Sequence, residues 1–380
     1  MQRSPWTVLI TANGRAFCSG ADVRQRQLRT REELTCLTDE ALQQFQPQPL
    51  HAILASLADR QLAAAGQARN AAKPEDRRRL ARESWARLLG NVEPPREVKI
   101  RAGSPPLDRV GELTIRRELL DVEPGITIPL MVIFPNQGNV RERRSLVVHF
   151  APDGISGMLR RNIDQIAAAL QAGRAVAFVE VRGTGASSPG ADHGQQGAMT
   201  AHSATELMLV RTLLAGQLRD LRAAWQHLAA IPKIDRTKLS ICGDSPAEPL
   251  PPAAPFSYPR RIDNRPSECL PQASLLALLC ALFEDDVASV EATGGLVTFR
   301  SVLDAPFVQV PHACIVPGVL REGDLVDLTA ALVPQEVTLR GLVDGSGRAV
   351  SPAAASQAYA AAIRAYSSAA LGHKLNFVER

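Results

Sequence analysis

From about residue 96 onward, short β-branched runs alternate with helical stretches, and this alternation limits the fold more than any other feature of the chain. Hairpin-like strands come first and β–α–β units follow, a pattern that favours an α/β fold with a mostly parallel sheet covered by helices. The predicted strands are 97–101, 111–116, 126–134, 145–150, 175–181, 238–242, 287–292, 336–343 and a last segment, 374–379. The predicted helices are 157–172, 204–230, 274–283 and 352–366.

Residues 1–95 differ in composition, being rich in Gln, Arg, Ala and Leu and poor in β-branched residues. Apolar residues recur at helical spacing over 75–89, and the Pro94-Pro95 pair interrupts the chain after them. We therefore expect a helical N-terminal extension over 1–95 and an α/β domain over 96–380. With 380 residues, 45% of them hydrophobic, the chain can bury one large core or two smaller ones.

Charge and cysteine usage argue against several classes of partner. The net charge is only +4, and the arginines are spread along the chain, so nucleic acid is not expected as a partner. The six cysteines contain no Cys-x-x-Cys pair, and no histidines have metal-ligand spacing, so we expect neither a metal nor a cofactor. Gly183 and Gly185 are interpreted as a turn, because a phosphate-binding loop needs more than this pair.

No apolar stretch has the length that spanning a bilayer requires. The apolar run at residues 6–12 is too short for the core of a secretory signal. The sequence is typical of a soluble protein without a membrane partner, and its cellular location stays open.

Ser245 follows the apolar run 238–242 in the segment Gly243-Asp244-Ser245. A serine on a sharp bend after a buried strand holds its Oγ clear of the sheet, where backbone N–H groups can face a reacting carbonyl. Gly243 relieves crowding at such a bend. The fifth position of the Gly-x-Ser-x-Gly pattern is Ala247, one methyl larger than usual.

Four segments in this order resemble the α/β-hydrolases of the acetyl xylan esterase and dienelactone hydrolase-like group, over residue 98 to the end. They are the strand and loop 146–154, the turn 178–185 with Glu180 in place of the usual Asp, the approach to Ser245 from 234, and 316–328 followed by 339–344. The resemblance implies the α/β-hydrolase fold and a serine esterase that forms an acyl-enzyme on small esters, acetylated carbohydrates among them.

The resemblance also implies a catalytic triad in the chain order Ser, Asp, His. Ser245 is the predicted nucleophile and Asp344 the predicted acid, and His373 is the histidine that follows them. Asp153 and Gly154, with Pro246 after the nucleophile, form the predicted oxyanion region. Asp344-Gly345 has a second interpretation as a simple turn, since Asp-Gly is a common turn former.

His373 departs from the family pattern, because it precedes the last predicted strand instead of following it. A histidine at a helix end, stabilised by the helix dipole, is the other interpretation of His373. His312, in a loop able to pass over the site, is the best substitute. His149 has the pattern of a core histidine, and His193 that of a solvated loop residue.

The segment after Ser245 departs from the family as well. Pro246 has no N–H to give to an oxyanion, and further prolines forbid a helix immediately after the turn. The prolines therefore leave two interpretations. Either residues 247–271 form an inserted loop over the pocket, or the turn at Ser245 is no longer built for catalysis. The alternative function is accordingly a catalytically impaired α/β-hydrolase-fold protein that binds a ligand or a partner.

The N-terminus carries a separate motif. Residues 14–22, Gly-Arg-Ala-Phe-Cys-Ser-Gly-Ala-Asp, resemble a segment of the crotonase (enoyl-CoA hydratase) family whose backbone amides hold a thioester oxyanion. The strands that this fold needs before the segment and after it are not found in the sequence, so crotonase function is not favoured.

Overall fold

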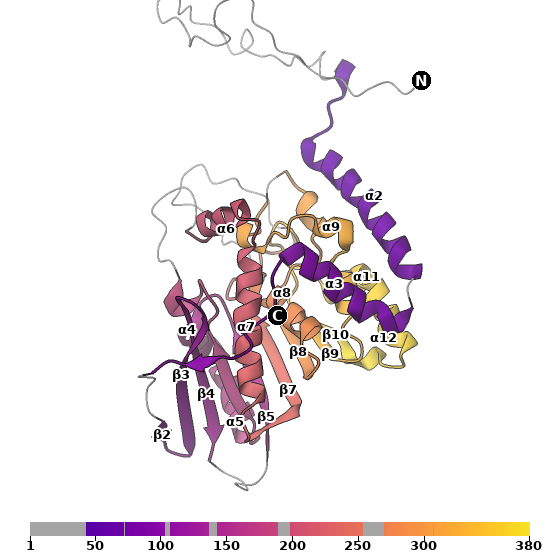
Figure 1. The fold of residues 1–380 in the computed structure, drawn as a ribbon. Coiled ribbons are helices and arrows are strands. Elements are labelled where there is room, and N and C mark those ends of the chain that lie inside the picture. The colour runs from indigo at the N-terminus through magenta and orange to yellow at the C-terminus, as the bar shows by residue number, and fades with distance from the viewer. Residues whose placement is uncertain are drawn as a thin grey trace, which may run out of the picture. The chain divides into compact units, whose positions relative to one another are not determined.

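The computed structural model describes residues 43–71, 73–102, 107–136, 143–188, 198–253, 270–306 and 308–380. Pro49–Arg380 form one compact unit, drawn in Figure 1. The crotonase-like motif at 14–22 lies outside the described residues.

A ten-stranded sheet runs through this unit in the order β1-β3-β4-β6-β5-β7-β8-β9-β10, with β2 paired to β3. The neighbouring strands in the part β6-β5-β7-β8-β9-β10 are parallel. The pairings among β1 to β4, and the pairing of β4 with β6, are antiparallel. The strands are β1 Lys99–Ile100, β2 Asp108–Val110, β3 Leu113–Glu123, β4 Ile126–Pro135, β5 Arg144–Phe150, β6 Ala175–Val179, β7 Ile234–Asp244, β8 Val287–Thr293, β9 Glu336–Arg340 and β10 Leu375–Val378. This architecture confirms the predicted α/β class and its mostly parallel, helix-covered sheet.

Helices cover both faces of the sheet. One face packs against α4 (Gly154–Arg161) and α5 (Ile163–Gln171), with Met158 and Ile166 in a small core against Phe178. The opposite face carries the larger core under α7 (Leu213–Ala229) and α8 (Gln272–Phe283). The remaining helices are α2 Leu50–Ala71, α3 Arg77–Leu89, α6 Ala198–Met208, α9 Val319–Glu322, α10 Leu325–Ala330, α11 Pro352–Ala358 and α12 Ala360–Ser368.

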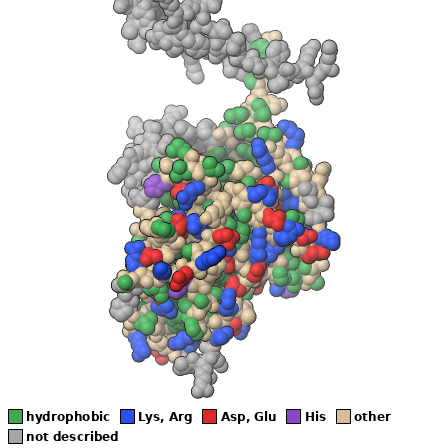
Figure 2. All heavy atoms as spheres, in the orientation of Figure 1, with side chains coloured by type: hydrophobic (Ala, Val, Ile, Leu, Met, Phe, Trp, Pro, Cys, Tyr) green, Lys and Arg blue, Asp and Glu red, His purple; other side chains and the backbone are tan. Residues whose placement is uncertain are grey.

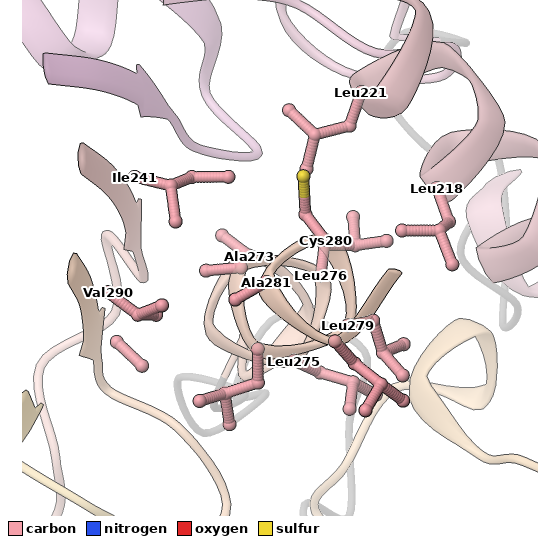
Figure 3. Close-up of a cluster of buried hydrophobic side chains, with 14 of the residues drawn as sticks. Leu218, Leu221, Ile241, Ala273, Leu275, Leu276, Leu279, Cys280, Ala281 and Val290 are labelled. Atoms are coloured by element: carbon pink, nitrogen blue, oxygen red, sulfur yellow. The ribbon is translucent and has the colours of Figure 1, made fainter. Parts of the chain in front are cut away.

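Helix α8 is apolar all the way round, as expected of a helix with no face toward water. In Figure 3, Ile241 of β7 and Val290 of β8 point toward it from one side, and Leu218 and Leu221 of α7 from the other. Cys280 lies within this cluster as a free, fully buried thiol. Burial of these side chains fixes α8 against the strand that leads to Ser245.

Each of three predicted helices is two helices in the structure. The predicted helix 204–230 is interrupted between α6 and α7, where Val210 adopts φ 55° and Thr212 accepts a hydrogen bond from the N–H of Ala215 at 3.1 Å. A threonine cap starts a new helix, which the apolar periodicity alone did not indicate. Likewise 157–172 divides into α4 and α5, and 352–366 into α11 and α12.

The helices of the N-terminal region pack onto the rest of the unit. Trp85 and Leu89 of α3 are buried in the larger core. Helix α2 lies against α9 and the 3-10 turn Arg300–Leu303, where Arg300 forms an ion pair with Asp59 at 2.6 Å. The functional division at residue 95 stays a prediction.

The described surface mixes charges of both signs. On the face shown in Figure 2, basic and acidic side chains are intermingled. Arg79 pairs with Glu83, and Arg87 with Glu322, each at 2.8 Å. None of the helices in the described ranges combines the length and apolar character that crossing a membrane needs.

Candidate functional site

Strand register brings the ends of β7, β8 and β9 to one edge of the sheet. Asp244 pairs with Thr293, and Thr293 pairs with Arg340, so the residues after them leave the sheet side by side. Ser245 is the first residue beyond β7; it is 1% exposed, and its N–H donates to the carbonyl of Thr293 at 3.1 Å. Ser245 therefore directly follows β7 at the carboxyl edge of the sheet, where the chain leaves the strand.

Gly294 allows the chain after β8 to approach this serine. Its φ is 69°, and a Cβ built there would lie 2.5 Å from the Cβ of Ser245 and 3.1 Å from its Oγ. A side chain at position 294 would therefore displace the serine. The Gly294-Gly295 pair after β8 is the sequence signal for this contact.

Asp344 lies at the same edge, in the loop after β9. Its Oδ1 accepts hydrogen bonds from the N–H groups of Ser346 at 2.8 Å and Arg348 at 3.0 Å, which closes a turn. The segment after Ser245 is bonded to this loop, because the N–H of Leu250 donates to Gly347 at 2.8 Å. The segment after Ser245 and the loop of Asp344 are thus hydrogen-bonded to each other. One oxygen of the Asp344 carboxylate is occupied by the two N–H groups of its own turn.

His373 lies at the other edge of the sheet. It is exposed in the 3-10 turn Gly372–Lys374, which comes before β10. Val378 of β10 aligns with Arg340 at the end of β9. His373 precedes Val378 by five residues, so it lies about 15–20 Å from that end of the sheet, measured along the strand. The structure does not bring His373 to Ser245 and Asp344, because a residue that precedes a parallel strand starts at the amino edge.

Two other histidines are engaged elsewhere. His149, on β5, stacks on Phe178 and is buried, and burial lowers its pKa to about 4, so it is neutral at pH 7. His312 has its Nδ1 2.8 Å from the Oγ of Ser203 on α6. Across the described residues no histidine nitrogen is hydrogen-bonded to Ser245 or Asp344. His193 lies outside those residues.

The predicted oxyanion loop follows β5, the strand beside β7. Gly154 has φ 72°, and the carboxylate of Glu180 accepts hydrogen bonds from the N–H groups of Ile155 and Ala186. The Asp153 carboxylate pairs with Arg161, which also donates to Asp244 at 2.9 Å. Arg161 therefore ties the loop after β5 to the residue before Ser245, a contact that the sequence did not indicate.

No metal-binding cluster accompanies this arrangement in the part of the chain that the structure describes. No group of three or more His, Cys, Asp and Glu side chains there could hold a metal ion. Cys242 and Cys280 are free thiols, and burial raises the pKa of both well above the ordinary value for a thiol. Both thiols are therefore neutral at pH 7.

Comparison with solved structures identifies the fold. An acetyl xylan esterase candidate from Bacteroides fragilis superposes with a TM-score of 0.58 at 11% identity, covering 82% of this chain and 77% of the other. The chain has the α/β-hydrolase fold. A methylesterase superposes with a TM-score of 0.51 at 15% identity, covering 80% of this chain and 58% of the methylesterase. No protein-family model matches the sequence, and no curated protein matches it.

The α/β-hydrolase fold normally leads from the nucleophile directly into a helix. Here no helix follows Ser245 in residues 246–253, and α8 begins only at Gln272. Nevertheless α8 packs where that helix belongs, since a Cβ on Gly243 would lie 2.2 Å from the carbonyl oxygen of Ala273. Helix α8 is thus separated from Ser245 by the proline-rich segment. Residues 254–269 of that segment lie outside the described residues.

Arg380 lies just beyond β10 and contacts the segment that contains Ser245. Its guanidinium donates to the carbonyl oxygen of Ser245 at 2.7 Å and to that of Ala247. Its Cβ lies against Gly341, where the lack of a side chain leaves room: a Cβ built there would be 2.7 Å from that of Arg380. No motif or spacing in the sequence indicated this contact of Arg380.

Proposed function

We propose that this chain is a carboxylic-ester hydrolase that uses Ser245 as its nucleophile and forms an acyl-enzyme. One observation carries the proposal: Ser245 lies on the turn at the end of β7, hydrogen-bonded to β8, and the segment after it is bonded to the Asp344 loop. In the reaction, Oγ attacks the ester carbonyl and the alcohol leaves, after which water releases the acid. Asp344 is the proposed acid of the site.

The proposal assigns the oxyanion region to the loop of Asp153 and Gly154, which ends the strand next to β7. Pro246 cannot supply the second donor, because it has no N–H. Loss of one such donor costs a factor on the order of 10²–10³ in turnover. His373 is not part of this proposal, so slow acyl transfer to Ser245 is expected, with turnover far below that of a complete triad.

Small acyl esters are the proposed substrates. The whole chain contains three tryptophans and three tyrosines, few for stacking on sugar rings. A short ester suits this composition better than a polysaccharide chain.

A second candidate is a non-catalytic protein that binds a ligand or partner with the same edge of the sheet. It is favoured by the histidines of the described residues, none of which has a nitrogen hydrogen-bonded to Ser245 or Asp344. Such a protein would have the same fold but would not catalyse ester hydrolysis.

Labelling by a fluorophosphonate probe, with hydrolysis of 4-nitrophenyl acetate, separates the two candidates. The parent protein is compared with Ser245→Ala and with Ser368→Ala, an exposed serine on α12 as the matched control. The esterase proposal expects labelling and hydrolysis that disappear only in Ser245→Ala, with the probe on the Ser245 peptide. A folded parent protein without either signal would overturn the esterase and leave the binding candidate.

A further inference from the structure

The carbonyl groups after Ser245 lack the partners that a helix would give them. In an α-helix each carbonyl accepts a hydrogen bond from the N–H four residues later. For Ser245 and Ala247 those positions are Pro249 and Pro251, and proline has no N–H. The proline-rich segment therefore removes the donors for these two carbonyl groups.

Arg380 bonds to the same two carbonyl groups. One guanidinium nitrogen donates to Ser245 and the other to Ala247, on either side of Pro246. Its Nε lies 4.0 Å from the carboxylate of Glu248. The side chain is only 20% exposed, so water competes weakly for these bonds.

We infer that Arg380 is a positioning residue for Ser245, because its guanidinium replaces the helical hydrogen bonds that Pro249 and Pro251 delete. A planar guanidinium can serve two carbonyl groups at once, which a single ammonium group at this distance does less well. The role of Ser245 as the reacting group rests on the proposed function. The hydrogen bonds from Arg380 to Ser245 and Ala247 are independent of that function.

The test is hydrogen–deuterium exchange of the peptide around Ser245 in Arg380→Ala and Arg380→Lys. The N–H groups of Ser245 and Leu250 are hydrogen-bonded and report on the turn. We expect their exchange to rise about ten- to a hundredfold in Arg380→Ala, as two charge-assisted hydrogen bonds are lost. Arg380→Lys should recover part of the protection, and exchange over α8 should not change. Arg364→Ala, an exposed arginine on α12, is the matched control.

The rate of fluorophosphonate labelling is measured on the same variants. In an active parent, labelling of Ser245 should fall in Arg380→Ala and recover partly in Arg380→Lys, at an unchanged thermal midpoint. Unchanged exchange around Ser245 in Arg380→Ala would overturn the inference, and so would unchanged labelling in an active parent. A parent without labelling contradicts the proposed function alone, and exchange then decides the role of Arg380.

Discussion

The carboxylate of Glu180 accepts a hydrogen bond from the N–H of Ile155 at 2.8 Å. Its other oxygen accepts one from the N–H of Ala186 at 2.9 Å. One buried side chain at the end of β6 thus joins the loop after β5 to the turn that follows β6 itself. The shape of the proposed oxyanion region depends on this bridge.

Glu180→Gln should destabilise the protein by about 1–3 kcal/mol, because an amide NH₂ would face a buried backbone N–H that has lost its acceptor. Urea denaturation gives the free energy of unfolding. Glu336→Gln, an exposed glutamate on β9, should change that free energy by less than about 0.5 kcal/mol. Equal losses in the two variants would mean that the bridge contributes nothing.

Gly154→Ala and Gly125→Ala separate backbone strain from crowding. Both glycines have positive φ, 72° and 80°, but a Cβ on Gly154 would lie 2.4 Å from Glu180, whereas nothing lies within 4 Å of one on Gly125. Gly125→Ala should cost about 1–2 kcal/mol from strain alone. Gly154→Ala should cost about 1–3 kcal/mol more, since the Glu180 bridge must move. Similar values for both would show that the loop relaxes freely.

Asp324 should make stability depend on pH. Burial raises the pKa of its carboxyl to about 6, against 3.8 as the ordinary value, and the hydrogen bonds from Phe299, Leu325 and Arg300 only partly oppose this. A folded-state pKa above the unfolded one gives stability that is fully present below pH 3.8 and lost as the pH rises through 6.

Relative to Asp324→Asn, the parent should therefore gain up to roughly 3 kcal/mol between pH 7 and pH 4. Taking this difference cancels the titration of the other carboxylates. The free energy of unfolding of both proteins, measured across that range, checks the sign. A constant difference would show that Asp324 titrates normally.

His373→Ala should leave the rate of fluorophosphonate labelling at Ser245 within about twofold of the parent. The reason is its exposed position at the amino edge of β10, away from the end of β7. A triad histidine would instead cost several orders of magnitude in activity. Its exposure also predicts a stability change below about 0.5 kcal/mol. A large loss of labelling at unchanged stability would place His373 in the reaction after all.

The sequence indicated the sheet and the place of Ser245 because both depend on local pattern. Buried strands such as β5 and β6 carry apolar runs that are followed by Gly- or Asp-containing turns. The position of Ser245 follows from its strand, since a residue after a parallel strand always lies at the carboxyl edge. The same rule places His373 at the amino edge once its neighbours form β10.

The contacts around Ser245 were not predictable in this way, because they join residues far apart in the chain. Arg380 and Ser245 are 135 residues apart, and Arg161 and Asp244 are 83 apart. Neither pair has a spacing that periodicity can reveal. The break at Val210 was missed for another reason, since a β-branched residue with positive φ runs against its own preference.

The close packing of Gly243 against Ala273 means that β7 and α8 meet without depending on the chain between them. Each is fixed by its own buried side chains, so their contact does not require the helix to follow the strand directly. We therefore expect the strand and the helix to keep this contact when residues are added to the connection, because lengthening a loop costs little entropy.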